Sequence, residues 1–484
     1  MGDGPYLIIS GLHMQHPSPR TAAYGLTLLV ALAIACDLLW MPIQVSDSLG
    51  EILDAQRSPS VWASFTENLG TEAYLRPLRI AQIKALFDVA QGTHYWLVYR
   101  GFHALLLIAA VLLFTRTLRV STAADFAAAA FALVVLIGLN TFRGTVQEAF
   151  PINHFLEILL LCLLTLNLAR SRGGFWIDVV GALTFIVAAL TLESGLLVWV
   201  VAASAWAVGW RGISARGLAM LTTLLLGYLY VRFVYLSTGV PAMTERSSGY
   251  LLELLDPVEI ARRFGAHPLW FHTYNVMAST SSVLFSEPRS GVFEAVRGWL
   301  DGRPLVRFVV PVATSVVTTG LIVWASTRRV ARWRELDDTA RFFLVFVAVL
   351  GASATLSFAY TKDEIMSTAG AFYALAAFGA MREALRTTAG MRRTAGRTFA
   401  LLLCVLSIGW TVRSAGVHYI LRSQAFKHQA DWVALPGLRK NTDEWPSDSV
   451  EERLILRLRA DAVGLVLPNT RIDHPGWPAG IWTD

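Results

Sequence analysis

Three carboxylates follow the first apolar run at spacings that place them on one side of a helix. Asp47, Glu51 and Asp54 stand at i, i+4 and i+7, and Ser46 can cap that helix. A carboxylate at the edge of a bilayer is desolvated on one side, which raises its proton affinity and suits it to act as a general base. Asp47 is therefore the candidate base. The plain structural alternative is a solvated residue in the first turn of an interfacial helix.

A second acid, Glu193, interrupts the long apolar stretch over residues 175–210. A charge at the middle of a bilayer costs about 2.5–3.5 kcal/mol or more. The sequence Thr191-Leu192-Glu193-Ser194-Gly195 is therefore expected to form a short outer turn between two spans, with Gly195 assisting the reversal. Either Glu193 has a catalytic role or it merely marks that turn, and the local sequence leaves both open.

Lys362 lies in a tight gap between two apolar runs, Tyr360-Thr361-Lys362-Asp363-Glu364. A cation at the membrane surface can bind a lipid phosphate as a point charge, and Tyr360 would flank such a site. Lys362 can also extend to the membrane surface and pair with Asp363, which is the structural alternative.

Several arginines fall in segments expected on the outer face, against the usual bias of positive charge toward the cytoplasm. Phosphate binding is one explanation for them. Pairing with the nearby Glu72, Glu245 or Glu259 is the other. These arginines are Arg76, Arg79, Arg246, Arg262 and Arg263.

The composition is that of a membrane protein. Of the 484 residues, 55% are hydrophobic and only 16% are charged, and the mean hydropathy is +0.50. Such a chain excludes a soluble enzyme, a nucleic-acid-binding protein and a disordered scaffold. Uncharged runs recur with about the 20 residues that cross a bilayer core of about 30 Å. We expect an all-α integral membrane bundle of about eleven spans. The runs fall at residues 22–41, 95–114, 122–141, 152–169, 175–192, 195–210, 216–237, 304–326, 341–359, 365–381 and 398–418.

The arginines also predict an orientation. Every second gap between the runs is rich in Arg, which places the N-terminus in the cytoplasm and the C-terminus outside. No small-residue cleavage site follows the first run, so it is expected to stay as an uncleaved span. High Ala and Arg with little Lys is typical of a bacterium with a GC-rich genome. The expected location is therefore the bacterial inner membrane.

Two domains are expected. Residues 1–420 form the membrane domain with long outer loops at 42–94 and 238–303, and residues 421–484 form a small outer tail. In the first loop, residues 76–88 have the pattern of an amphipathic helix lying in the interface. The second loop, rich in aromatic residues, is expected to rest on the membrane surface.

This arrangement resembles the GT-C superfamily of integral-membrane glycosyltransferases. The matching features are Asp47-Ser48 after the first span, the short helix 49–55, the stretch 74–78, Glu193 in an outer turn and the stretch 360–364. The resemblance covers most of residues 20–420, mainly as layout. Many relatives carry two adjacent acids where this chain has Asp47 and Ser48. A second acid, if one is needed, must then come from Glu51 or Glu193.

The resemblance implies transfer of a sugar from a polyprenyl-phosphate-linked donor to a glycan, lipid or protein acceptor at the outer face, with inversion. It implies that Asp47 is the base and that outer cations offset the charge of the departing phosphate. The implied cations are Lys362, Arg76, Arg246, Arg262 and Arg263.

Other functions stay open at this point. An envelope polysaccharide polymerase or ligase, a lipid-linked-sugar flippase or other transporter, and a non-catalytic assembly subunit all have similar spans. The sequence lacks a Walker loop, a dinucleotide-binding GxGxxG and a GxSxG elbow. The three cysteines lie within apolar runs, and no metal-ligand spacing is present, so no cofactor is predicted, although a divalent metal stays possible.

Overall fold

The computed structural model describes residues 18–67, 69, 74–147, 151–237, 255–265, 267, 269–286, 292–330, 336–439 and 449–465. Within these ranges the regular structure is helical and contains no strand. The elements in chain order are α1 (Pro19–Leu39), α2 (Ser46–Arg57), α3 (Val61–Glu67), α4 (Pro77–Ala90), α5 (Tyr95–Leu118), α6 (Ala123–Gly138), α7 (Asn140–Gln147), α8 (His154–Ala169), α9 (Phe175–Thr191), η1 (Glu193–Leu196), α10 (Leu197–Ala207), α11 (Ala215–Tyr230), η2 (Val231–Tyr235), α13 (Pro257–Phe264), α14 (Leu269–Phe285), α15 (Val292–Leu300), α16 (Val306–Val330), α17 (Asp338–Leu356), α18 (Ser367–Ala389), α19 (Arg393–Arg439) and α20 (Val450–Gly464).

The chain is an all-α protein whose apolar helices are compatible with a multi-pass membrane protein. Six helices in the described part of the chain are long and apolar enough to cross a membrane. A seventh is obtained if α6 and α7, which bend by 71° at their junction, form one broken span. Each of the eleven predicted ranges holds a helix, but the predicted count of about eleven spans is not confirmed. Three of these helices, α8, α9 and α10, have only 16, 17 and 11 residues.

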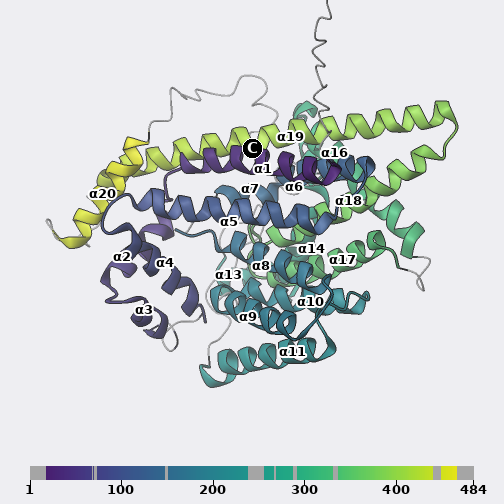
Figure 1. Cartoon of the computed structure of the whole chain (residues 1–484). Helices are drawn as coiled ribbons and strands as arrows, with labels where there is room; N and C mark the ends of the chain where they lie inside the picture. Colours follow the sequence, from purple (N-terminus) through teal and green to yellow (C-terminus); the bar gives the residue numbers. More distant parts are fainter. Residues whose placement is uncertain are drawn as a thin grey trace, which may run out of the picture.

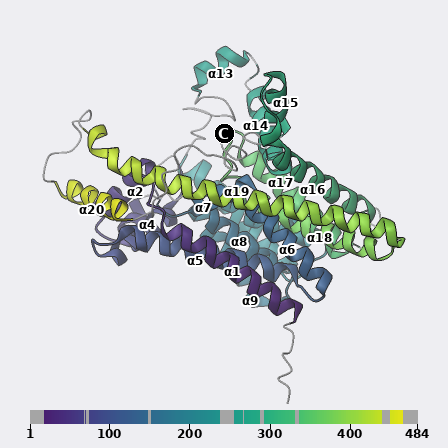
Figure 2. The ribbon, with the colours of Figure 1, turned by 90° about the horizontal axis from the view of Figure 1, so that it is seen from above.

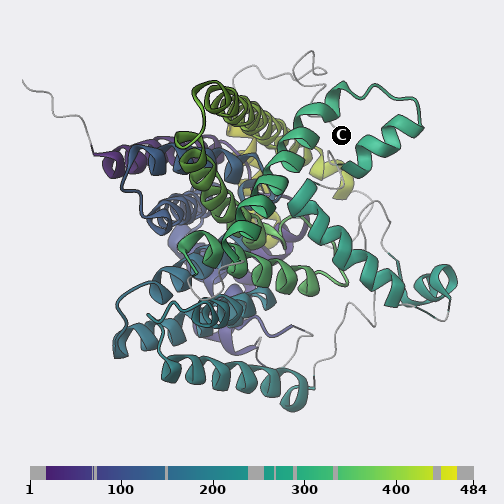
Figure 3. The same cartoon turned by 90° about the vertical axis from the view of Figure 1, so that its right-hand side faces the viewer.

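Helices α17, α6, α16 and α8 pack around α18, whose residues from Ser367 to Met381 are all buried. Pairing of α1 with α5 is fixed by a hydrogen bond between the hydroxyls of Thr27 and Thr115, 2.7 Å apart. Figure 1 shows α1, α5 and α19 running alongside one another, with α9 to α11 on the opposite side of the bundle. Figure 3, a view at right angles, shows the same separation between α19 at the top and α11 at the bottom.

The two ends of the bundle can be named by their charged residues. At the Arg170 end, the guanidinium of Arg170 after α8 lies 3.1 Å from Asp338 at the start of α17. Arg119, at the end of α5, donates to the carbonyl of Arg170. At the opposite, Glu193 end lie η1, the start of α8 and the end of α17. In the predicted orientation the Arg170 end is cytoplasmic.

The last long helix, α19, has 47 residues and so extends over about 70 Å. The predicted boundary at residue 420 lies inside it, because the helix continues beyond the apolar run. Its far part packs with α20, α2 and α4 in a second apolar core that includes Trp432, Leu454, Ile52 and Ile83. Figure 2 shows α20 folded back beside the end of α19, next to α2.

Part of the predicted second loop belongs to the bundle. Helix α14 contacts α16, α17, α18 and α7, and its Asn275 and Ser279 are buried. It therefore packs among the bundle helices and does not rest free on a surface, contrary to the prediction for residues 238–303. The shorter helices α13 and α15 project from one side (Figure 2). In the first loop, α4 forms at the residues predicted as an amphipathic helix in the interface. Its Ala81 and Ile83 are buried against neighbouring helices.

Candidate functional site

A cavity of about 280 Å³ opens at the Glu193 end of the bundle. We call it the Glu193 cavity. It lies where η1, η2, the start of α4 and the segment after α17 meet. The lining mixes polar and apolar residues, and we call these two sets the polar wall and the apolar wall. The apolar wall includes Leu196, Phe233, Leu356 and Phe358. The polar residues that line it are Tyr74, Arg76, Glu193, Ser194, Tyr228, Arg232 and Tyr360.

The turn that carries Glu193 depends on a glycine. Helix α9 ends at Thr191, Leu192 is extended, and the chain then reverses through the 3-10 turn η1. A Cβ atom at Gly195 would lie 2.1 Å from the carbonyl oxygen of Ala188 in α9, so only glycine fits this close approach. The reversal confirms that Glu193 lies in a turn between two helices.

Glu193 joins two arginines that are distant in the sequence. Arg76 donates to it through Nε and Nη2, with Nη2 2.6 Å and Nε 2.9 Å from Oε2. Arg232 places Nη1 3.3 Å from Oε1 and also donates to the hydroxyl of Tyr228 at 3.2 Å. The guanidinium of Arg76 lies over the ring of Tyr74, 4.2 Å from its centroid.

The charges at this site favour an ionised carboxylate. Burial alone would raise the pKa of Glu193, but the charges and hydrogen bonds of Arg76 and Arg232 outweigh burial and lower that pKa. Burial likewise opposes the charge of Arg76, yet Glu193 raises the pKa of Arg76 overall. A carboxylate of lowered pKa is a weak base. Glu193 is thus better suited to hold the two guanidinium groups than to take a proton. Two arginines and one glutamate leave one net positive charge on the wall.

A polar cluster adjoins the cavity. Arg79 of α4 forms an ion pair with Glu51 of α2. One turn further along α4, Gln82 donates to Glu157 at 2.8 Å, and His154 lies 3.4 Å from the same carboxylate. Glu51, a predicted catalytic residue, is therefore already paired, and it does not line the cavity. These contacts fix α4, and with it Arg76, against α2 and α8.

The predicted base lies near the start of α2. Asp47 is the second residue of that helix, and its side chain falls outside the described part of the structure. The prediction that Ser46 caps the helix is wrong. Val45 is already helical and occupies the capping position, with no side-chain hydrogen bond there, so Ser46 lies inside the first turn.

Of the other predicted cations, those within the described ranges do not line the cavity. Lys362 is exposed and does not line it, whereas its neighbour Tyr360 does. On α13, Arg262 lies 2.8 Å from Glu259, and Arg263 pairs with the same carboxylate. These pairs match the alternative that the sequence left open. Arg246 lies outside the described residues.

Arg232 is the cavity residue that the sequence analysis missed. It falls near the end of the apolar run predicted at 216–237, and there it counted only as part of the span. An arginine at the outer end of a span runs against the positive-inside bias, and that signal could have identified it.

Among the residues described, no three His, Cys, Asp or Glu side chains lie close enough to hold a metal ion. Comparison of the chain with models of protein families, with well-characterised proteins and with solved structures finds no match in any of the three.

Proposed function

We propose that this chain is a membrane glycosyltransferase that uses a polyprenyl-phosphate-linked sugar, and that the Glu193 cavity binds the lipid phosphate of the donor. The observation that carries the proposal is the pair of arginines, Arg76 and Arg232, held by one partly buried carboxylate in a cavity that is also lined by apolar residues, at one end of a membrane bundle.

The polar wall suits a phosphate. Arginine binds phosphate through several N–H donors in a fixed plane, and a low-dielectric setting strengthens such contacts. The net positive charge of the wall favours an anion. The hydroxyl of Ser194 is buried and has no hydrogen-bond partner among the described residues, so it is available as a further donor.

The apolar wall suits the prenyl chain. Leu229 and Phe233 approach from η2 and its preceding helix, while Leu356 and Ile365 approach from the other side. Burial of a prenyl chain against such residues removes apolar surface from water. A ligand with an anionic head and an apolar tail matches both sets of lining residues, whereas a soluble nucleotide sugar would use only the polar set.

The proposed reaction is a single displacement. An acceptor hydroxyl attacks the anomeric carbon, the bond from that carbon to the phosphate oxygen breaks, and polyprenyl phosphate departs with the electron pair. Arg76 and Arg232 stabilise the charge that develops on the phosphate. The hydroxyl proton passes to a carboxylate, for which Asp47 is our candidate. Inversion at the anomeric carbon follows from one displacement. Lys362 stays a second candidate for contact with the donor.

The test is mass spectrometry of envelope glycans and lipids from a deletion strain complemented with variants. We expect the deletion to remove one sugar, and the wild-type chain and Arg57→Ala to restore it. Arg57 is a matched control because it is an exposed arginine paired with Asp54, away from the cavity. Arg232→Gln and Asp47→Asn should fail to restore the sugar.

Loss of folding is separated from loss of function because Arg232→Gln leaves the Arg76–Glu193 ion pair in place, so the carboxylate keeps a partner. Membrane levels of each variant are measured alongside. Full restoration of the sugar by Arg232→Gln would contradict the proposal. So would a deletion strain whose glycans and lipids are unchanged.

A further inference from the structure

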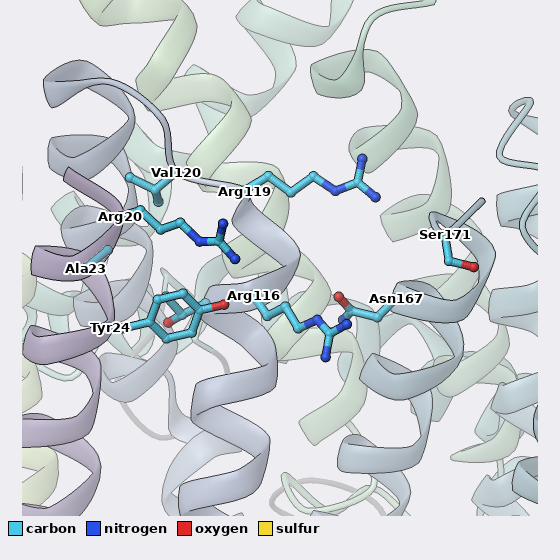
Figure 4. Close-up of a pocket in the computed structure, with 9 residues that line it drawn as sticks. Arg20, Ala23, Tyr24, Arg116, Arg119, Val120, Asn167 and Ser171 are labelled. Carbon is cyan, nitrogen blue, oxygen red and sulfur yellow. The ribbon is translucent and has the colours of Figure 1, made fainter. Parts of the chain in front are cut away.

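A second cavity, of about 430 Å³, lies at the Arg170 end of the bundle, far from the Glu193 cavity along the helices. It is formed by the start of α1, the end of α5 and the end of α8. We call it the Arg116 cavity. Figure 4 shows three arginines and Tyr24, Asn167 and Ser171 around one hollow. The three arginines are Arg20, Arg116 and Arg119.

The charge of this cavity is not balanced by acids. None of its lining residues is acidic, and none of its three arginines forms an ion pair within the described ranges. Other arginines at this end differ. Arg170 pairs with Asp338, and Arg329 pairs with Glu383. The positive-inside bias explains why arginines occur at this end, but it does not explain why three of them surround a hollow without a carboxylate.

The backbone conformation of Arg119 is unusual for an arginine. Arg119 follows the last residue of α5 with φ of 51°, in the left-handed region where glycine is usual. A residue with a Cβ atom is disfavoured there. The position nevertheless carries an arginine, whose Nη2 donates to the carbonyl of Arg170 and so fixes a side chain that lines the cavity.

The remaining lining residues suit a polar head beside a bilayer. Arg20 and Tyr24 lie one turn apart at the start of a membrane helix, and Arg116 lies in the last turn of another. Ala23 and Val120 add apolar surface beside Arg20 (Figure 4). Arginine-lined pockets between the ends of membrane helices are suited to the phosphate groups of anionic lipids.

We infer that the Arg116 cavity binds a phosphate group, supplied by the head of an anionic phospholipid in the leaflet at the Arg170 end. The inference is independent of the proposed glycosyltransferase activity. It holds for either orientation of the chain, because both leaflets contain phospholipids.

The test is native mass spectrometry of the purified full chain in detergent, titrated with phosphatidylglycerol or with zwitterionic phosphatidylcholine. We expect tighter retention of phosphatidylglycerol. Removal of each arginine should weaken that retention about fivefold. The double variant Arg116→Gln/Arg119→Gln should thus lose most of it, and Arg116→Lys/Arg119→Lys should keep part of it.

Arg172→Gln is the matched control, since Arg172 is an exposed arginine at the same end that does not line the cavity. An equal loss of phosphatidylglycerol retention in Arg172→Gln would show that general surface charge explains the binding, and it would overturn the inference. Unchanged binding in Arg116→Gln/Arg119→Gln would also overturn it. A parallel titration with inorganic phosphate distinguishes the source. Displacement of the lipid by millimolar phosphate would assign the site to a soluble phosphate compound and overturn the lipid assignment, whereas no displacement supports the lipid.

Discussion

Glu193 determines how the charged residues are arranged at its end of the bundle. Its carboxylate lies between two guanidinium groups that would otherwise repel each other in a partly buried site. Removal of one member of a buried charge network leaves the others uncompensated, which costs more than the loss of an exposed pair. The stability of the site therefore depends on this one side chain.

Glu193→Gln should lower the free energy of unfolding by about 2–4 kcal/mol, because two arginines are left facing each other. Chemical unfolding in detergent measures this value. Glu451→Gln is the control, since Glu451 pairs with the half-exposed Arg57 and faces no second arginine, so the loss should be much smaller. Equal losses of unfolding free energy in the two variants would show that Glu193 stabilises the fold no more than Glu451 does.

The effect of Glu193 should depend on pH. Its folded-state pKa lies below the ordinary value of 4.5. The ionised group thus stabilises the fold fully above pH 4.5, and this contribution is lost as the pH falls through the folded-state pKa. The difference in unfolding midpoint between wild type and Glu193→Gln should be largest at neutral pH and shrink in acid below the folded-state pKa. A difference that stays constant with pH would contradict this assignment of charge.

Single residues were partly predictable from the sequence. Arg76 stands out as a positive charge in a segment expected on the outer face, and Glu193 as a charge within a long apolar stretch. Their contact across 117 residues could not be predicted, because one sequence holds no information on which loops meet. Arg262 was proposed as a phosphate ligand, yet its helix supplies Glu259 one turn away, and such local pairs form without any ligand.

At the scale of elements, the turn η1 positions the site. It reverses the chain against α9 within four residues, and its glycine touches the carbonyl of Ala188. Any displacement of this turn moves Glu193 away from Arg76, since η1 continues directly into α10 and only Leu192 separates it from α9.

Gly195→Ala should therefore disrupt both folding and function. Its Cβ would lie 2.1 Å from the Ala188 carbonyl oxygen, so the backbone of η1 or α9 must shift. We expect a loss of at least about 2 kcal/mol in unfolding free energy. Gly227→Ala in α11 is the control, because nothing lies within 4 Å of its new Cβ and alanine favours a helix. A Gly195→Ala protein as stable as the Gly227→Ala protein would refute the close approach.

The positions of helices were the most predictable feature. Apolar runs set their locations, because a helix is the form that satisfies its own backbone hydrogen bonds in a membrane. Their ends were less predictable. The run at 398–418 ends where the apolar residues end, but α19 continues to Arg439 because its far part packs on other helices. Likewise α14 was not expected in the bundle, since its buried Asn275 and Ser279 make it less apolar than a simple span.

At the scale of the whole molecule, the far end of α19 supports the first loop. The indole of Trp432 donates to the carbonyl of Ile43 at 2.6 Å and is buried in the same core as α2, α4 and α20. Residues distant in the chain thus hold the segment that carries Arg76.

Trp432→Ala should destabilise this region by about 3–5 kcal/mol, because it empties a buried site and leaves a carbonyl unpaired. Hydrogen exchange should increase in α2 and α4 before it increases in α18. Trp62→Ala is the control, since Trp62 is 71% exposed and should change little. Unchanged exchange in α2 and α4 would show that α19 does not hold the loop.

The most direct measurement is photo-crosslinking of the purified chain with a polyprenyl phosphate that carries a reactive group near its head. We predict labelling of η1, η2 and residues 356–365, competition by unlabelled polyprenyl phosphate, and loss of labelling in the Arg76→Gln/Arg232→Gln variant. Labelling that is spread along the bundle, or that is equally strong in that variant, would contradict the assignment of the Glu193 cavity as the donor site.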